Sequence, residues 1–298
     1  MTPEIGALLV DLEAAGYIAE PATATAIFLA RATQKPLLIE GDAGVGKTEL
    51  AKVLARLLGC ELIRLQCYEG LDAQTALYEW DYPRQMLRVR MSQDTARENP
   101  RELEAQIFSR EYLLERPLLR AITSPDRSPV LLIDEIDRAD DGFEAFLLEL
   151  LSDFQVTIPE LGTIRAQHPP IVVLTSNRTR ELGDALRRRC LYLYLDHPSL
   201  EREVRIIRSR CPDAKDPLPG QIARFHQALR ARGLVKPPGV AETLDFTRAL
   251  LSLRQQHLEP EVVTQTLGCL LKDKHDFDTV SPSEVASLVA SVLQEAPS

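Results

Sequence analysis

A run of eight residues combines the glycines, the lysine and the hydroxyl side chain that bind the phosphates of a nucleoside triphosphate. The P-loop spacing G-x-x-x-x-G-K-[ST] is matched by Gly41-Asp42-Ala43-Gly44-Val45-Gly46-Lys47-Thr48. Glycines let backbone amides close around a polyanion at a helix N-terminus, where the helix dipole favours negative charge. We expect Lys47 to reach the terminal phosphates, Thr48 to hold magnesium, and Glu49 to complete the nucleotide-binding stretch.

Two adjacent carboxylates follow an apolar run later in the chain. Residues 130–133 are Val-Leu-Leu-Ile, which predicts a buried strand, and Asp134 and Glu135 come next. Such a strand would aim Asp134 at the magnesium shell, whereas Glu135 could orient and deprotonate the attacking water. A second acid distinguishes hydrolases from nucleotide kinases and most switch GTPases. The sequence has no N-K-x-D motif for reading guanine, so we expect adenine as the base.

A third group of polar residues lies near the end of the candidate nucleotide-binding segment. Asn177 follows the apolar run at 171–175, and we expect its amide to hydrogen-bond the attacking water or the γ-phosphate. The alternative is an asparagine that only turns a loop. Arg188 and Arg189 end a short predicted helix, and they form either a solvated basic face or an arginine finger, with Arg189 the first candidate and Arg188 the second. A finger supplied in trans requires a ring of subunits.

Strands and helices must alternate to position these residues. The P-loop follows a strand-like run at 36–40 and precedes an amphipathic helical pattern at 49–59. This strand–loop–helix context favours a phosphate-binding loop over a glycine-rich turn that occurs by chance. Similar apolar runs recur at 61–65, 130–133, 171–175 and 191–195, with helical stretches between them. The pattern predicts an α/β fold with a five-stranded parallel sheet flanked by helices, preceded by two helices in the first 35 residues.

Beyond residue 197 the sequence predicts helices only. Apolar stripes at helical spacing include Phe246, Leu250 and Leu253, and the last helix begins at a capping box, Ser281 to Glu284. We therefore predict two domains, a nucleotide-binding α/β domain at 1–197 and an all-α lid at 198–298. Residues 236–239, Lys-Pro-Pro-Gly, predict a rigid turn within the lid.

Composition narrows the class of protein. The chain has 298 residues, 45% hydrophobic and 27% charged, which is ordinary for a soluble globular protein. A net charge of −9 argues against nucleic acid as the main partner. The five cysteines form no C-x-x-C pair, which predicts neither a zinc site nor a disulfide framework. Neither a signal peptide nor an apolar run long enough to span a membrane is present, so we expect a cytoplasmic protein without membrane insertion.

With these motifs in order, the chain resembles AAA+ ATPases, and in detail the MoxR family. Residues 134–139, Asp-Glu-Ile-Asp-Arg-Ala, are close to that family's D-E-I-N-R-A. Residues 146–158 are similar to its L-L-E-A-M-E-E-x-Q-V-T-I, which runs into an expected hairpin at 155–166. The resemblance implies an ATPase that uses ATP and Mg²⁺, forms a ring, usually a hexamer, and acts with a partner that carries a von Willebrand factor A domain.

Three segments look like the CoxD-like branch of that family. They are residues 68–72 with 76–80, residues 186–192 and residues 236–245. The branch implies an accessory ATPase that matures the metal centre of a molybdenum-containing carbon monoxide dehydrogenase. One departure concerns the lid helix, where the family's sensor arginine is replaced by the run Gly239 to Glu242, and Arg248 comes only later.

Other functions and roles stay open at this level. A nucleic-acid motor would want a basic stripe, which the mixed charges do not show, and a slow nucleotide-gated binding module would not need Glu135, Asn177 or Arg189. The aromatic residues of the segment 68–82 could grip a client or pack beneath an insert; they are Tyr68, Tyr78, Trp80 and Tyr82.

Overall fold

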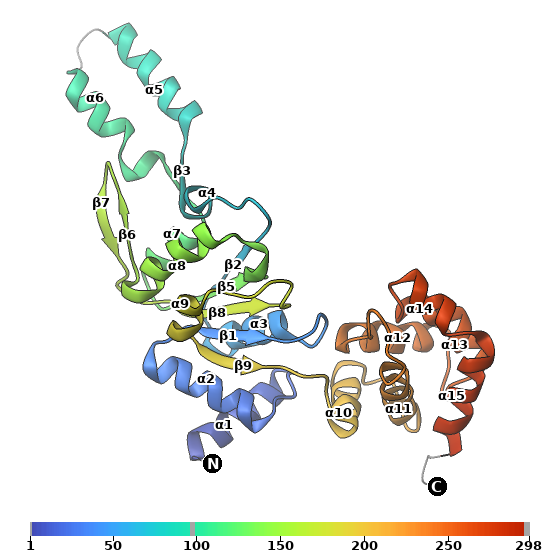
Figure 1. The fold of residues 1–298 in the computed structure, drawn as a ribbon. Helices are drawn as coiled ribbons and strands as arrows, with labels where there is room; N and C mark the ends of the chain where they lie inside the picture. Colours follow the sequence, from blue (N-terminus) through green and yellow to red (C-terminus); the bar gives the residue numbers. More distant parts are fainter. Residues whose placement is uncertain (1, 96–98, 295–298) are drawn as a thin grey trace. The chain divides into compact units, whose positions relative to one another are not determined.

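The computed structural model describes residues 2–95 and 99–294. A five-stranded sheet with the order β2-β5-β8-β1-β9 forms its α/β part (Figure 1). β2 pairs in parallel with β5, β5 with β8, and β8 with β1. The predicted five-stranded parallel sheet flanked by helices is therefore confirmed, and its strands are β1 (Leu37–Glu40), β2 (Leu62–Gln66), β5 (Val130–Asp134), β8 (Ile171–Ser176) and β9 (Leu191–Tyr194).

The central strands are apolar because helices cover both faces of the sheet. Every residue of β1 and β5 is buried, as expected of parallel strands that lie inside an α/β layer structure. Leu131 and Ile133 of β5 share one hydrophobic cluster with Phe143 and Leu147, which lie on the helix that follows. This buried packing fixes the strands, and the strands fix the positions of the residues that follow them.

Fifteen α-helices occur in the described residues. They are α1 (Pro3–Ala14), α2 (Pro21–Thr33), α3 (Lys47–Leu58), α4 (Ala73–Leu77), α5 (Tyr82–Thr95), α6 (Pro100–Ile107), α7 (Pro117–Ile122), α8 (Asp141–Asp153), α9 (Asp184–Arg189), α10 (Leu200–Arg210), α11 (Leu218–Arg230), α12 (Val240–Ser252), α13 (Pro260–Thr266), α14 (Lys274–Thr279) and α15 (Pro282–Gln294). Short 3₁₀ turns lie at Arg110–Tyr112, Ile136–Arg138 and Leu267–Cys269. None of the helices in the described part of the chain is long and apolar enough to cross a lipid bilayer.

Local sequence signals set the helix ends. α3 stops before Gly59, whose φ of 58° is the left-handed conformation that glycine adopts at low cost. α8 starts after Asp140, whose side chain accepts a 2.8 Å hydrogen bond from the Phe143 amide. At α15, Ser281 accepts from the Glu284 amide at 3.3 Å, in agreement with the predicted helix start.

Two insertions extend the sheet part. β3 (Tyr78–Trp80) and β4 (Leu113–Glu115) pair antiparallel, and α5 and α6 lie side by side between them (Figure 1). The amide of Gln85 and the guanidinium of Arg88 join these helices through hydrogen bonds to the Ile107 carbonyl and to Gln106. The predicted hairpin also forms, from β6 (Gln155–Ile158) and β7 (Gly162–Arg165).

Between residues 198 and 294 the structure describes helices and no strand, as predicted. Phe225 of α11 and Phe246 of α12 stack with their ring centroids 6.3 Å apart in a common hydrophobic cluster. The prediction that Leu253 continues the stripe of Phe246 and Leu250 is wrong, because α12 ends at Ser252 and the Leu253 side chain is 52% exposed. The sequence reasoning also did not specify α13 and α14.

The described residues fall into two compact units. The first, here called the lid unit, comprises the chain up to Glu20, Gly41–Leu50, and the chain from Tyr194 onward. The second, the sheet unit, comprises Pro21–Glu40 and Ala51–Leu193. The phosphate loop thus clusters with the lid helices, whereas the carboxylates at the end of β5 belong to the sheet unit. The proposed boundary near residue 197 stays a prediction.

Candidate functional site

The phosphate loop has a backbone that depends on glycine. A Cβ atom on Gly41 would lie 2.2 Å from the Leu195 carbonyl oxygen, so any side chain there would collide with main chain. Gly44 and Gly46 have φ values of 80° and 99°, in a region where other residues are strained. The glycines that the spacing selected are therefore required by the shape of the loop.

Lys47 and Thr48 lie in the first turn of α3, where backbone amides are unpaired within the helix. The Lys47 ammonium donates to the carbonyl oxygens of Gly41 and Asp42 at 2.6 and 2.7 Å. It is therefore held across the mouth of the loop, at the helix end that attracts anions. A phosphate in the loop would meet this cation.

An apolar cavity of about 250 Å³ opens beside the phosphate loop within the lid unit. Its lining includes the loop residues Gly44 to Gly46 and Glu49, with apolar residues from three other segments, namely Tyr17, Ile18, Ile206, Val240, Ala241 and Leu244. The Tyr17 ring lies 3.8 Å from the position of a Cβ atom on Gly46. Burial raises the pKa of Tyr17 to about 12, so its phenol stays neutral at physiological pH. Such walls suit a flat aromatic base whose phosphates occupy the loop.

Polar side chains of the lid near this cavity are paired with one another. Arg248 lines the cavity but bonds Asp245 at 3.1 Å, and Arg210 lies 3.4 Å from Glu49. Glu242 accepts a 2.9 Å hydrogen bond from the Gly239 amide and so caps α12. The lid therefore approaches the loop with main chain, apolar side chains and a carboxylate.

The carboxylate pair lies at the end of β5: Asp134 is the last residue of the strand, and Glu135 follows it. Asp134 is buried, and its Oδ1 accepts from the Thr175 hydroxyl at 2.6 Å. That same hydroxyl accepts from the Glu135 amide at 3.0 Å. Glu135 has a φ of 56°, a left-handed backbone that is uncommon outside glycine, and its carboxylate pairs with Arg138 at 2.8 Å. This backbone turn sends the two consecutive carboxylates in different directions.

Asn177 follows β8, the neighbour of β5. Its backbone amide donates to Asp137 at 3.2 Å, and Asp137 also accepts from the amide and hydroxyl of Thr179. The Asn177 side chain makes no hydrogen bond with any residue that the structure describes. Asp134, Glu135 and Asn177 therefore lie at the carboxyl-terminal edge of the sheet, where the strand before the phosphate loop also ends.

Two arginines of α9, Arg188 and Arg189, lie at the other edge of the sheet, whereas Arg187 lies 3.9 Å from Glu40, the last residue of β1. Arg188 and Arg189 line an open hollow of about 680 Å³ together with Lys35 and Pro36, which precede β1, and Pro169, which precedes β8. Arg189 bonds the Ser152 hydroxyl at 3.0 Å. Because a six-residue strand spans about 20 Å, these arginines are remote from Asp134 and Asn177 of the same sheet.

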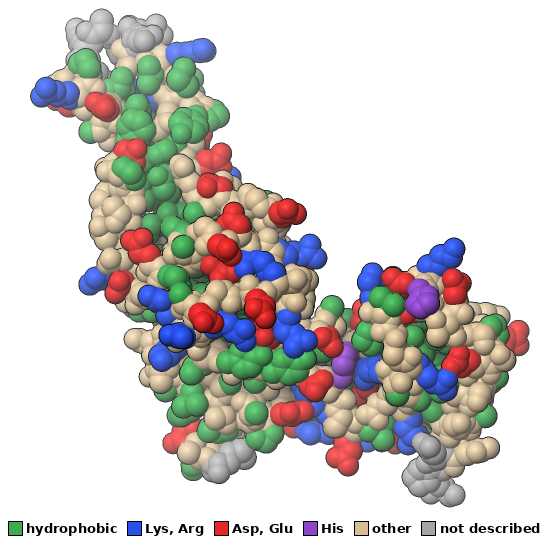
Figure 2. All heavy atoms as spheres, in the orientation of Figure 1, with side chains coloured by type: hydrophobic (Ala, Val, Ile, Leu, Met, Phe, Trp, Pro, Cys, Tyr) green, Lys and Arg blue, Asp and Glu red, His purple; other side chains and the backbone are tan. Residues whose placement is uncertain are grey.

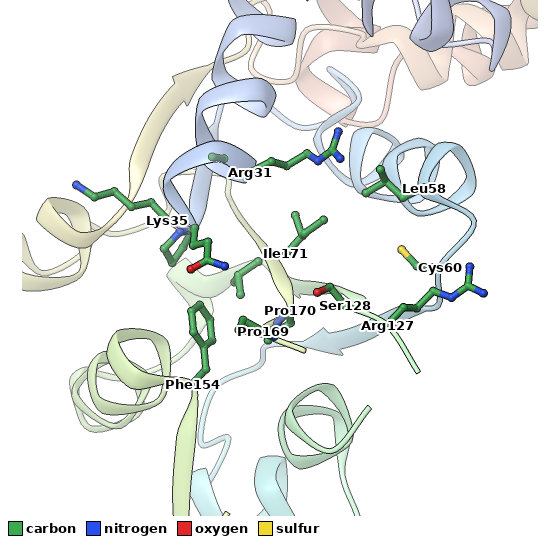
Figure 3. Close-up of a pocket in the computed structure, with 14 residues that line it drawn as sticks. Arg31, Lys35, Leu58, Cys60, Arg127, Ser128, Phe154, Pro169, Pro170 and Ile171 are labelled. Atoms are coloured by element: carbon green, nitrogen blue, oxygen red, sulfur yellow. The ribbon is translucent and has the colours of Figure 1, made fainter. Parts of the chain in front are cut away.

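A second cavity of the sheet unit, of about 360 Å³, also lies at the amino-terminal edge (Figure 3). Arg31 and Arg127 lie at its rim, and Ser128 and Ile171 line it (Figure 3). Three helices, α2, α3 and α8, end at this cavity, and the Arg127 guanidinium bonds the Gly59 carbonyl at 2.5 Å. Arg31 and Arg127 complement the negative, carboxyl-terminal ends of these helices. We therefore assign this cavity no role in nucleotide binding.

The aromatic residues of the segment 68–82 divide into two groups. Tyr78 and Trp80 are buried, and the Trp80 ring meets Phe108 edge-on at 5.3 Å. Tyr68 and Tyr82 are 52% and 60% exposed. Tyr78 and Trp80 therefore pack beneath the insertion, and of these four aromatic residues only Tyr68 and Tyr82 are accessible to a client.

The cysteines are reduced, and burial makes two of them unreactive. All five cysteines are free thiols. Burial raises the pKa of both Cys67 and Cys190 to about 12, which keeps these thiols protonated and unreactive.

Two residues that shape the site were not predicted from the sequence: Tyr17 and Arg64. Arg64 had a signal, because it is the one charged residue of the apolar strand β2, Leu62–Gln66. Tyr17 had none, because its partners lie far away in the sequence.

The chain is similar to known proteins in both sequence and fold. Residues 36–190 match the family described as AAA domain (dynein-related subfamily). Uncharacterized proteins of Staphylococcus aureus (strain bovine RF122 / ET3-1) and Staphylococcus haemolyticus (strain JCSC1435) are each 24% identical over 226 residues, which are 74% of this chain and 76% of theirs. A solved structure of the Thermotoga maritima RuvB Holliday junction branch migration motor is similar with a TM-score of 0.46 and 20% identity, over 90% of this chain and 78% of that one. A variant of the same RuvB gives a TM-score of 0.49 and 18% identity, over 99% and 79%.

Proposed function

Because the chain belongs to the dynein-related subfamily of AAA domains, we propose that it is a magnesium-dependent ATPase that works in a ring and remodels a partner protein. The observation that carries the proposal is the phosphate loop that opens onto an apolar cavity. A loop that binds phosphates beside a cavity that accepts a base defines a nucleotide site. The absence of a guanine-reading motif favours ATP.

The motif residues have separate roles in the proposed hydrolysis. Lys47 contacts the terminal phosphates, and Glu135 orients and deprotonates the attacking water, with Asn177 as a second hydrogen-bonding group. Thr48 and Asp134 would hold Mg²⁺, which when bound neutralises phosphate charge. Their hydroxyl and carboxylate oxygens are ligands that this ion prefers.

The place of the arginines supports a ring. Arg188 and Arg189 lie at the edge of the sheet opposite to Asp134, so they are remote from the carboxylates of their own subunit. They are exposed, and a neighbouring subunit could present its nucleotide to them. We propose that Arg189, with Arg188 as the alternative, acts in trans in a homo-oligomeric ring, a hexamer by resemblance.

The proposed client is a metalloenzyme, and the proposed partner carries a von Willebrand factor A domain. Three segments that resemble the CoxD-like branch support a molybdenum-containing carbon monoxide dehydrogenase-like client. Apolar side chains also gather on the α5–α6 insertion (Figure 2). Exposed on α5 are Tyr82, Met86, Leu87 and Met91, and methionine-rich surfaces adapt to varied protein partners.

Two experiments test this function. Steady-state ATPase activity is measured with and without DNA, since a nucleic-acid motor is stimulated by DNA and a nucleotide-gated binding module turns over negligibly. Retention of a client by the Glu135→Gln protein in the presence of ATP, but not by Lys47→Ala, supports remodelling. Strong stimulation by DNA would instead favour the motor.

A further inference from the structure

A salt bridge links Asp134 to the adjacent strand. The Arg64 side chain of β2 donates to Asp134 Oδ2 from Nε at 3.0 Å and from Nη2 at 2.6 Å. The Asp134 side chain is 4% exposed, whereas that of Arg64 is 49% exposed. Since Thr175 occupies Oδ1, both carboxylate oxygens have a donor within the sheet unit.

The position of Arg64 follows from strand register. In β2, Ile63 and Leu65 are buried on one face, and Arg64 lies on the other. β2 pairs with β5 so that Arg64 is opposite Leu132, two positions before Asp134. An arginine side chain is long enough to reach the carboxylate from there. The fold itself therefore supplies Asp134 with a fixed positive neighbour.

This neighbour matters if Asp134 holds Mg²⁺, and the inference rests on that proposed function. Among the described residues no group of three or more His, Cys, Asp or Glu could hold a metal ion. The Asp134 carboxylate is an oxygen donor of the kind that magnesium prefers, but a single carboxylate leaves most ligands to the phosphates and water. A metal ion here would depend on the nucleotide.

We propose that Arg64 is a positioning residue for Asp134 that makes divalent-metal binding conditional on ATP. A bare divalent cation near Asp134 is repelled by the guanidinium, which has already neutralised the carboxylate. A magnesium–ATP complex is net negative, so the same guanidinium does not oppose its binding. Arg64 thus disfavours the metal alone and tolerates the metal with its nucleotide.

The probe is Mn²⁺ alone, titrated into nucleotide-free protein and followed by electron paramagnetic resonance. Arg64→Gln should bind Mn²⁺ more tightly than wild type, by about tenfold for one unit charge near a divalent ion in a water-like dielectric. Arg64→Lys keeps the charge and should resemble wild type. The matched control is Arg120→Gln, which loses an equal charge in an exposed pair with Glu61 and should change nothing.

Adding Asp134→Asn to Arg64→Gln should remove the gain, which places the metal at Asp134. A purely structural role for Arg64 predicts the opposite sign, since a loosened carboxylate would bind Mn²⁺ less well. Equal Mn²⁺ affinity in folded wild type and Arg64→Gln overturns the inference.

The proposed role of Asp134 is tested separately by the magnesium dependence of ATP binding in Asp134→Asn. If that dependence is unchanged, the magnesium role of Asp134 falls. If it is lost while Arg64→Gln behaves as wild type, only the role of Arg64 falls.

Discussion

The amide of Val240, at the start of α12, donates a 2.9 Å hydrogen bond to the Gly44 carbonyl in the phosphate loop. The preceding residue, Gly239, lies so close that a Cβ atom there would be 2.8 Å from the Ala43 carbonyl oxygen and from Gly44 Cα. The start of α12 therefore contacts the loop through main chain.

This contact gives the first prediction. Gly239→Ala should weaken ATP binding, because the backbone conformation of Gly239 suits alanine but the added methyl group displaces the loop. Overpacking costs about 1–3 kcal/mol, which corresponds to roughly 5- to 150-fold in affinity. Isothermal titration calorimetry measures it. Gly220→Ala is the matched control, since its Cβ would meet nothing closer than 3.5 Å. Equal affinity in both variants would show that the contact is not coupled to the nucleotide.

Lys47→Ala should lose ATP affinity by at least about tenfold, because a hydrogen bond to a charged group contributes about 1.5–3 kcal/mol. Fluorescent-nucleotide titration measures the loss, and circular dichroism checks that the loop variant folds. Lys52→Ala, an exposed lysine of the same helix, should bind as wild type does. An affinity of Lys47→Ala within a few-fold of wild type would mean that the loop is not a phosphate site.

Glu135→Gln should bind ATP normally but hydrolyse it on the order of 10²-fold more slowly, since the carboxylate acts on the water. Phosphate release and nucleotide affinity are measured on the same preparation. Glu149→Gln, an exposed change on α8, serves as the control. Near wild-type turnover in Glu135→Gln would assign the base to another residue.

Arg189→Ala should fold, bind ATP and lose most turnover, as arginine fingers contribute about 10³–10⁵ in rate. Mixing it with Lys47→Ala should restore part of the activity, because mixed rings contain an intact loop facing an intact arginine. Titration of one variant into the other, followed by phosphate release, measures the rescue. Arg120→Ala, which removes an exposed arginine paired with Glu61, is the control. No rescue at any ratio, with mixed rings shown to form, excludes a finger in trans.

The lid contains a buried ion pair with a predictable response to acid. Glu203 accepts from Arg230 at 2.7 and 2.8 Å and from the Thr243 hydroxyl at 2.7 Å. Burial alone would raise the Glu203 pKa, but hydrogen bonds from His226 and Arg230 outweigh it and lower the pKa to about 2. Because the folded pKa is depressed, this stabilisation is present above the ordinary value of 4.5 and is lost as the pH falls toward 2.

Glu203→Gln should therefore lower the free energy of unfolding at pH 7 by about 3–5 kcal/mol, since it leaves Arg230 without its partner. Urea denaturation at several pH values measures the difference from wild type, which should shrink below pH 4.5. Glu201→Gln, an exposed neighbour on α10, should change stability by no more than about 0.5 kcal/mol. A constant difference across the acid range would contradict the lowered pKa.

Local sequence patterns predict the five strands of the sheet, the phosphate loop and the helical C-terminal part, but not α13 and α14. These features are local signals, because glycine spacing, apolar runs and capping residues act within a few positions. The place of Leu253 in the stripe of its helix was wrong, because α12 ends one residue earlier.

Contacts between residues far apart in the sequence depend on how the chain folds. Strand order and register place Arg64 beside Asp134, 70 positions away in the chain, and no local pattern encodes such a pairing. The same packing puts Arg189 at the edge of the sheet opposite to Asp134. It also separates buried Trp80 from exposed Tyr82, because burial depends on neighbours that the chain brings together only when it folds.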